Sequence, residues 1–187
     1  LFDSSNHYEE EEEMNTLLNK TDLIYLLTQQ NKLDAAMREE LGISESDWMS
    51  TMAMEHSIAL NVELHEFINA CFKSWKYWKR KDMTMDDVLD EAIDVIHFCM
   101  LRLNKSTAKP EFIAGNVESE LQDKRKLQDR AAVKRVIYHL SNGAMSAESI
   151  LGYVLSILDY YGFTAQDIIN QYNKKNAVNF RRLASGY

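Results

Sequence analysis

The chain has 187 residues but only one proline and six glycines, so few of its positions favour a tight turn. Such a composition favours long helices over a sheet of short strands. The first long segment agrees, because its apolar residues recur at helical spacing from Leu23 to Leu41, just before a glycine. The sequence therefore predicts an all-α protein, organised as a helical bundle.

The same periodicity, with its capping residues, predicts further helices along the chain. A second should begin near Ser44 and run, with a break, to about Lys79. A third should begin after Thr84 and end near Leu103. Residues 104–115 include the single proline and are expected to form a loop. The remaining segments that we expect to be helical are 118–140, 146–162 and 164–187.

The N-terminal residues 1–13 differ in composition from the rest of the chain. They contain an unbroken run of glutamates, Glu9 to Glu13, and few apolar side chains. A block of like charges of this kind is usually disordered. Residues 14–187 are numerous enough to form one domain with a hydrophobic core. We therefore expect a disordered acidic segment followed by a single all-α domain.

The formal net charge of −8 argues against binding to nucleic acid, whose phosphates repel an acidic surface. No apolar run approaches the roughly 20 residues that a membrane-spanning helix needs. Cys71 and Cys99 fall within apolar helical patterns, which indicates buried, reduced thiols. With no signal peptide recognised, these features predict a protein of the cytoplasm or of another reducing compartment.

Two acidic pairs lie in the segments that we expect to form the second and third helices. Glu63 and Glu66 are three residues apart, and so are Glu91 and Asp94. On an α-helix this spacing places both carboxylates of a pair on nearly the same face, about one turn apart. Each of the two helices would then present two carboxylates together.

An acidic pair in so acidic a chain can simply line a solvated face. The neighbouring residues favour an inward position instead. The first pair lies beside an apolar helical stripe that includes Leu64 and Phe67. The face that carries Asp94 continues as Phe98 and Leu101, which a solvated face would not do.

Four carboxylates turned inward would repel one another, and their pKa values would rise unless a cation neutralised them. Mg²⁺ prefers oxygen ligands and is commonly bound by carboxylates together with substrate phosphates. The pattern is therefore typical of a helical four-carboxylate core that binds Mg²⁺. A di-iron bundle is the competing interpretation. It normally needs Glu-x-x-His pairs, and His65 and His97 fall outside that register.

Two further segments carry residues suited to a nucleotide. Residues 73–81, between the acid pairs, interleave basic side chains with tryptophan and tyrosine. Their rings could stack on a base while their ammonium groups approach phosphates. Residues 172–187 are basic and rich in amides, which suits a polyphosphate. Both segments also have plainer interpretations, as the basic C-terminus of a helix and as a solvated terminal helix.

Three motifs in this order resemble those of a known family. They are Glu63-x-x-Glu66, then Glu91-x-x-Asp94-x-x-His97-Phe98, and finally Lys175-Asn176-x-x-Asn179-x-x-Arg182-x-x-x-Gly186-Tyr187. From residue 23 to residue 187 the chain resembles the all-α dimeric dUTPases, which are related to the MazG-like nucleoside triphosphate pyrophosphohydrolases.

The resemblance implies a site for each part of a nucleotide. Two or more Mg²⁺ ions would be bound by the acids, which are also the expected catalytic residues: Glu63, Glu66, Glu91 and Asp94. The phosphates would contact Lys79, Lys175, Asn176, Asn179, Arg182 and Tyr187. The base would lie against Gln30, Asp34, Trp75, Trp78 and His97.

The resemblance also implies a reaction, the Mg²⁺-dependent hydrolysis of dUTP, and of dUDP, to dUMP with release of diphosphate or phosphate. A homodimer would carry it out, with Glu66 as general base, and the activity would keep uracil out of DNA. The family usually has asparagine where this chain has Asp34. This departure leaves the choice of base open, so a MazG-like or dCTP-cleaving pyrophosphohydrolase is one alternative. A di-iron oxidoreductase, and a binding protein that keeps the fold without turnover, are the others.

Overall fold

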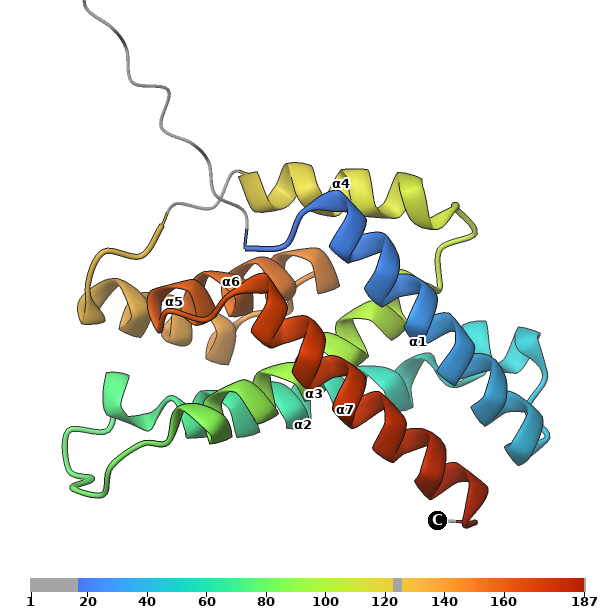
Figure 1. Cartoon of the computed structure of the whole chain (residues 1–187), viewed down its shortest axis with the longest axis horizontal. Coiled ribbons are helices and arrows are strands. Elements are labelled where there is room, and N and C mark those ends of the chain that lie inside the picture. The colour runs from blue at the N-terminus through green and yellow to red at the C-terminus, as the bar shows by residue number, and fades with distance from the viewer. Residues whose placement is uncertain (1–16, 123–125, 187) are drawn as a thin grey trace, which may run out of the picture.

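A computed structural model describes residues 17–122 and 126–186 (Figure 1). Within these ranges every regular element is a helix and no strand is present, so the predicted all-α fold is confirmed. The acidic segment 1–13 lies outside the described residues. Its disorder, and the domain boundary at residue 14, stay predictions. No helix in the described part of the chain is long and apolar enough to cross a membrane.

The helices follow one another through the described residues with short connections. In chain order they are α1 (Lys20–Leu41), the π-helical turn η1 (Asp47–Thr51), α2 (Ala53–Ala70), the 3₁₀ turn η2 (Phe72–Ser74), α3 (Met85–Leu103), α4 (Pro110–Gln122), α5 (Arg130–Asn142), α6 (Ala147–Tyr160) and α7 (Ala165–Ala184). Figure 1 shows α2 and α3 side by side and antiparallel, with α7 crossing α3, and α7 also packs against α1.

Helix α3 lies at the centre of the bundle, in contact with α1, α2, α6 and α7. Its buried side chains cover most of its circumference and include Val88, Ile93, Ile96 and Met100. A helix that is apolar around most of its surface is stable only when other helices surround it. This central position explains why Asp90, Glu91 and Asp94 are partly buried against neighbouring helices, whereas Asp86 and Asp87 in the first turn are exposed.

Several helices begin and end at the predicted capping residues. At the start of α7 the Thr164 hydroxyl accepts from the Asp167 N–H at 3.2 Å, and the Asp167 carboxylate accepts from the Thr164 N–H at 2.8 Å. Ser146 caps α6 through its hydroxyl. Gly42 ends α1 with a φ of 65°, a left-handed conformation that favours glycine. Thr84 precedes α3 as predicted, but its side chain makes no capping bond.

The second helix is shorter than predicted. It ends at Ala70 and not near Lys79, and η2 and a non-helical segment follow. The Trp75 indole N–H donates to the Ile68 carbonyl at 2.9 Å. In a continuing helix that carbonyl would accept from the backbone N–H four residues on. The indole therefore satisfies a carbonyl at the helix end, and the chain turns back toward α3.

The prediction of a loop over residues 104–115 was also wrong for its second half. Helix α4 begins at Pro110, because the first position of a helix needs no N–H donor and proline suits it. The predicted helix 118–140 is in fact divided between α4 and α5. Asp129 starts α5 by accepting from the Ala132 N–H at 2.7 Å. Asparagine and aspartate are strong helix starters, and this signal lay inside the segment that we treated as one helix.

Candidate active site between α2 and α3

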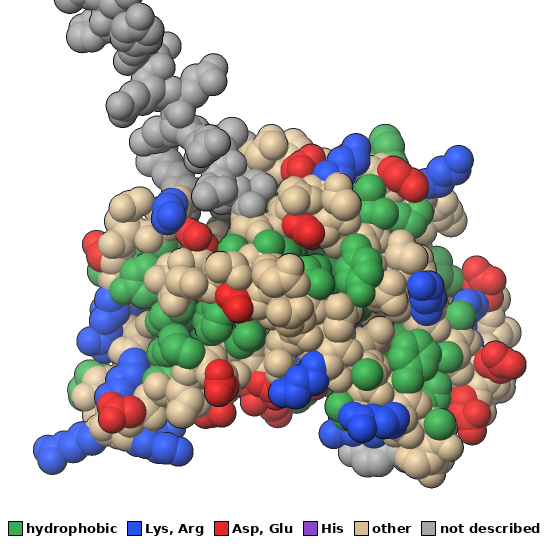
Figure 2. Space-filling view, in the orientation of Figure 1, with side chains coloured by type: hydrophobic (Ala, Val, Ile, Leu, Met, Phe, Trp, Pro, Cys, Tyr) green, Lys and Arg blue, Asp and Glu red, His purple; other side chains and the backbone are tan. Residues whose placement is uncertain are grey.

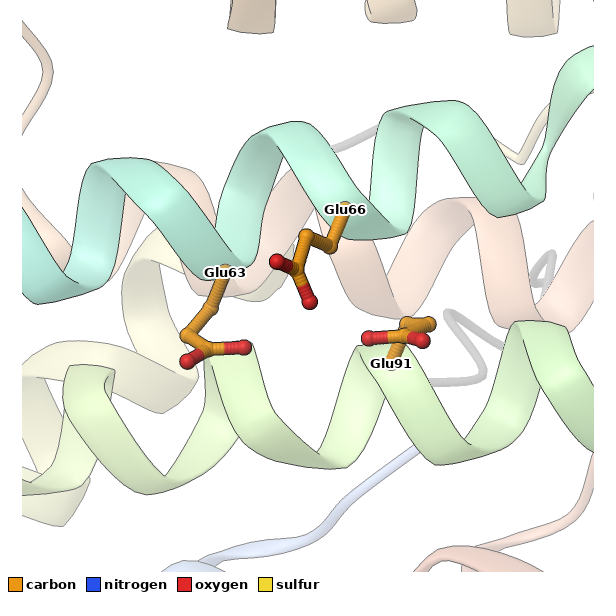
Figure 3. A group of neighbouring side chains, drawn as sticks. All are labelled: Glu63, Glu66 and Glu91. Atoms are coloured by element: carbon orange, nitrogen blue, oxygen red, sulfur yellow. The ribbon is translucent and has the colours of Figure 1, made fainter.

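The antiparallel packing of α2 and α3 brings their acids together. Figure 3 shows Glu63 and Glu66 of α2 and Glu91 of α3 pointing toward one another across the space between the two helices. One carboxylate oxygen from each of the three lies within 4.8 Å of the others. We call these three residues the carboxylate group. Each element is a helix, so the spacing of three residues sets the direction of the side chains, as the sequence predicts.

The fourth predicted acid, Asp94, is not a member of the carboxylate group. Its Oδ2 atom pairs with the Lys175 ammonium, which comes from α7. The same ammonium bonds Oδ2 of Asp90 at 2.8 Å and the Asp90 carbonyl at 2.9 Å. Sequence analysis did not single out Asp90, although it lies four residues before Asp94 and so shares its helical face.

The pKa values of the acids show how closely their charges are crowded. The pKa of Glu63 is raised to about 7, first by burial and then by the charges of Asp94, Glu66 and Glu91. Burial also raises the pKa of Glu91, with Asp94 and Glu66 adding to it. Burial raises the pKa of Asp94, while Lys175 opposes the rise. Such crowding favours a bound cation.

The donor atoms of the carboxylate group suit a hard divalent cation. All are carboxylate oxygens, the ligand type that Mg²⁺ prefers, and no histidine of the described residues belongs to the group. Of the two histidines near the motifs, His65 contacts the Asn61 carbonyl at 2.6 Å, and His97 bonds to Gln30. The acids therefore fit the Mg²⁺ ions that the sequence predicts better than they fit a di-iron centre with histidine ligands.

A second polar cluster is buried where α1, α3 and α7 meet. Oε1 of Gln30 accepts from the Tyr172 hydroxyl at 3.0 Å and from Nδ1 of His97 at 2.9 Å. Nε2 of Gln30 donates to Oδ1 of Asp34 at 2.8 Å. The His97 and Tyr172 rings stack at 4.0 Å. We call these four residues the Gln30 cluster; it joins three of the predicted base-binding residues to Tyr172, which sequence analysis missed.

The hydrogen bonds fix which atoms of the Gln30 cluster stay free. Gln30 Oε1 has accepted two bonds and is satisfied, whereas one N–H of its amide is left over. Burial lowers the pKa of His97 to about 3, so its ring is neutral. Because Nδ1 donates, Nε2 is an acceptor, and it is buried without a partner among the described residues. Among the described residues, one donor and one acceptor of the cluster are thus left without a partner.

Asp34 is the only member of the cluster with a carboxyl group, and it is 4% exposed. Burial raises its pKa to about 7, and the Gln30 hydrogen bond and the charges of Arg38 and Lys105 oppose the rise. Near neutral pH this carboxyl can therefore carry a proton or release one. An asparagine at the same place could not change its charge.

Residues 73–81, which we call the aromatic segment, follow the C-terminal end of α2, the helix that carries two of the acids. Trp75 is half-buried, and Trp78 meets its ring edge-on at 5.8 Å. The Trp78 side chain is 60% exposed, so its ring is open to a ligand. The Lys79 ammonium lies 3.8 Å from the centre of the Phe72 ring, and no described contact joins Lys79 to the carboxylate group.

The predicted phosphate-binding residues of the C-terminal motif lie along α7. Asn176 is buried, and its Oδ1 has no partner among the described residues. Asn179 and Arg182 follow Lys175 by four and seven residues, so they share its helical face. Figure 2 shows basic side chains gathered over the C-terminal end of α7. Tyr187 lies outside the described residues, and its role stays a prediction.

Comparison with known proteins identifies the family of this chain. A family model described as dUTPase matches residues 22–187, which is most of the chain. The chain belongs to the dUTPase family. It is accordingly a dUTP diphosphatase, an enzyme whose substrate is a small nucleotide. A search of curated proteins gave no match.

Sequence analysis missed two residues, Tyr172 and Asp90, that contact predicted site residues. Tyr172 follows Ile168 by four residues in the buried stripe of α7. A tyrosine at a core position needs a partner for its hydroxyl, which is a usable signal. Asp90 was one of many acids, and only the approach of α7 distinguishes it.

Proposed function

We propose that this dUTPase hydrolyses dUTP to dUMP and diphosphate, and dUDP to dUMP and phosphate, in an Mg²⁺-dependent reaction at the carboxylate group. The observation that carries the proposal is the convergence of the three carboxylates, with oxygens of Glu63, Glu66 and Glu91 within 4.8 Å of one another. Asp94, at the edge of the group, completes the proposed metal ligands. Bound Mg²⁺ would supply charge neutralisation for the phosphates and lower the pKa of a bound water.

Glu66 is the proposed general base. Its side chain is exposed, and it faces the other two carboxylates in Figure 3. In the proposed step a water oxygen forms a bond to the β-phosphorus of dUTP, and Glu66 takes the proton. The bond from that phosphorus to the oxygen shared with the α-phosphorus breaks, and dUMP leaves. Because water attacks directly, no side chain has to form a covalent intermediate.

Lys175 is the proposed cation beside the reacting phosphates, because its ammonium already lies at the edge of the carboxylate group. Arg182 and Asn179 extend the same face of α7 and would bind the outer phosphates. Asn176 and Tyr187 are proposed to assist them, and Lys79 would approach from the aromatic segment. Lys175 would stabilise the negative charge that develops on the leaving dUMP, and the other groups would hold the phosphates that become diphosphate.

The free atoms of the Gln30 cluster support uracil as the preferred base. Uracil offers carbonyl acceptors and an N3–H donor. The remaining N–H of Gln30 can donate to a carbonyl, and Nε2 of His97 can accept from the N3–H. Cytosine has no hydrogen on N3 and would leave the His97 nitrogen unsatisfied. Trp78, with Trp75 behind it, is proposed to stack on the ring.

A second substrate, dCTP, is favoured by one observation. Asp34, where an asparagine is usual in the family, bonds to Gln30. An ionised carboxylate is an acceptor and suits the amino group of cytosine. We therefore propose weaker but measurable hydrolysis of dCTP.

We also propose that the enzyme is a homodimer that associates through α2. Met54, Ile58 and Val62 are spaced four residues apart on this helix and are 72%, 57% and 49% exposed. A shallow hollow beside this stripe is lined in part by Ile58, Val62 and Glu66. A partner subunit seated there would therefore lie next to the carboxylate group. Sedimentation velocity of Ile58→Glu should show monomer, whereas Phe112→Glu, at an exposed apolar site on α4, should stay dimeric. Dimers of both variants would contradict an interface on α2.

The experiment that tests the reaction measures diphosphate release from dUTP, dCTP and other nucleoside triphosphates, and phosphate release from dUDP. Mg²⁺-dependent turnover with dUTP as the best substrate is the expected result. Equal turnover after complete chelation of divalent cations would overturn the proposed role of the carboxylate group. A purine nucleotide as best substrate would overturn the proposed role of the Gln30 cluster.

A further inference from the structure

Lys175 occupies an unusual position for a residue that is expected to bind phosphate. Its ammonium bonds two carboxylates of α3, those of Asp90 and Asp94, and one carbonyl. The Lys175 side chain is only 19% exposed, and that of Asp94 is 29% exposed. A half-buried pair of this kind is screened less by solvent than an ordinary surface ion pair.

This contact takes an acid out of the metal site. Glu63, Glu66 and Glu91 converge within 4.8 Å, but Asp94 does not join them. Its Oδ2 atom is instead paired with the Lys175 ammonium. An ammonium and a divalent cation are both attracted to the same carboxylate, and each lowers the affinity of the other for it.

Asp90 provides a separate attachment for the same ammonium. Lys175 bonds Oδ2 of Asp90 at 2.8 Å, and the Gln171 amide donates to Oδ1 of Asp90 at 2.6 Å. Gln171 and Lys175 are one helical turn apart on α7. Asp90 is therefore held by two side chains of α7, and neither of these contacts requires Asp94.

We propose that Lys175 is a tethered cation that competes with a divalent metal ion for Asp94, and that Asp90 retains Lys175 beside the site when the metal ion binds. The inference rests on the metal site of the proposed function and adds an exchange of cations to it. Binding of a metal ion shifts the ammonium from Asp94 toward the space that the substrate phosphates occupy. The metal ion and the polyphosphate thereby favour each other's binding through one side chain of α7.

The direct test is the binding of Mn²⁺ to the full-length enzyme without nucleotide, measured by electron paramagnetic resonance of the free ion. In Lys175→Met the competitor is gone, and Mn²⁺ should bind about tenfold more tightly than in the wild type. Lys174→Met is the matched control, because Lys174 is exposed and also carries one charge near Asp90. It should change the affinity by less than about threefold. Lys175→Arg keeps the charge and should bind Mn²⁺ as the wild type does.

Equal or weaker Mn²⁺ binding by Lys175→Met overturns the competition. Equal gains in Lys174→Met and Lys175→Met overturn it as well, because the effect would then be one of net charge. Helix content from circular dichroism identifies any variant that fails to fold. Lys175→Arg then shows whether a change in Mn²⁺ affinity comes from the charge of Lys175 or from its packing, because arginine keeps the charge. If the wild type binds no Mn²⁺ at all, the proposed metal site fails, and this result is distinct from equal binding by all variants.

The role of Asp90 is tested by combining substitutions. Asp90→Asn removes the carboxylate of the second attachment and leaves Asp94 as the one carboxylate bonded to Lys175 among the described contacts. Lys175 should then compete more strongly for Asp94, so Mn²⁺ binding should weaken by more than the loss of one nearby charge would cause. In the Lys175→Met background only the loss of charge remains. Asp90→Asn should therefore cost several-fold more affinity with Lys175 present than without it. Equal costs in the two backgrounds would show that Asp90 does not retain Lys175.

Discussion

The carboxylate group and the Gln30 cluster satisfy their polar atoms in different ways. Glu66 is exposed, Glu63 and Glu91 are half-buried, and their charges repel one another. Gln30 is 3% exposed and has hydrogen bonds to three side chains of the same chain. In the first region burial and mutual repulsion raise the pKa values of Glu63 and Glu91, and the Lys175 charge opposes the rise. The second is held in place by the fold and leaves only a donor and an acceptor for a ligand.

This difference corresponds to the two functions that we propose for the site. In the proposed function, the crowded charges of the carboxylate group would bind metal ions and, through them, the phosphates that all nucleotides share. In the same proposal, the Gln30 cluster would distinguish one base from another, because a mismatched base would leave a buried atom unsatisfied. Substitutions in the two regions should therefore alter different steps.

The largest effect is expected from Glu66→Gln. The substitution keeps the size of the side chain and removes the proposed general base and one negative charge. Turnover of dUTP should fall by roughly a thousandfold or more, and that of dCTP by a similar factor. Steady-state diphosphate release measures both. Glu55→Gln, at an exposed position of the same helix, is the control and should keep wild-type turnover. A loss confined to one base would contradict the division between the two regions.

A smaller effect is expected from Asp34→Asn on stability. Because burial raises the pKa of Asp34 from 3.8 to about 7, the folded protein binds a proton more tightly than the unfolded chain does. The stability that this proton contributes is fully present below about pH 4 and is lost as the pH rises through 7. Across that range the wild type should lose up to about 4 kcal/mol that Asp34→Asn does not lose.

Urea unfolding at pH 5 and at pH 8 measures this difference. The free energy of unfolding of Asp34→Asn should rise relative to the wild type as the pH increases. Glu40→Gln, an exposed acid of the same helix, should follow the wild type. Parallel curves for the wild type and Asp34→Asn would mean that Asp34 keeps an ordinary pKa.

The same substitution should sharpen base selectivity. Asparagine replaces a carboxylate, which only accepts when ionised, with an amide that can also donate. The ratio of kcat/KM for dUTP to that for dCTP should rise by about tenfold, the size of one hydrogen-bond difference of about 1.4 kcal/mol. Competing hydrolysis of the two nucleotides measures the ratio. No change would assign the choice of base to Gln30 and His97 alone.

The smallest effect is expected from Tyr172→Phe. Loss of the hydroxyl leaves Gln30 Oε1 with one donor in place of two, which should cost about 1 kcal/mol of stability. It should also raise KM for dUTP several-fold with little change in kcat, because the amide is less firmly oriented. Tyr25→Phe is the control, since Tyr25 bonds Asn173 at 2.7 Å at the exposed edge between the same helices. Equal effects on KM from both substitutions would show that orientation of Gln30 is unimportant.

Local patterns predicted much of this enzyme because they depend on residues a few positions apart. The capping box of Thr164 and Asp167, the left-handed Gly42 and the three-residue spacing of the acids all act within one helical turn. The errors occurred where a local signal had two meanings. Pro110 was treated as a loop residue, although it also suits the first position of a helix.

The sequence by itself determined an all-α chain, the helical faces that carry acids, and the family to which the motifs belong. Only the tertiary structure decided which polar atoms meet. Lys175 reaches Asp94 across 81 residues of chain, and Tyr172 reaches Gln30 across 142. No periodicity connects positions so far apart. Their pairing follows from the way α7 crosses α3 and α1, because the buried stripe of α7 has to cover the core, and the polar residues beside that stripe are placed with it.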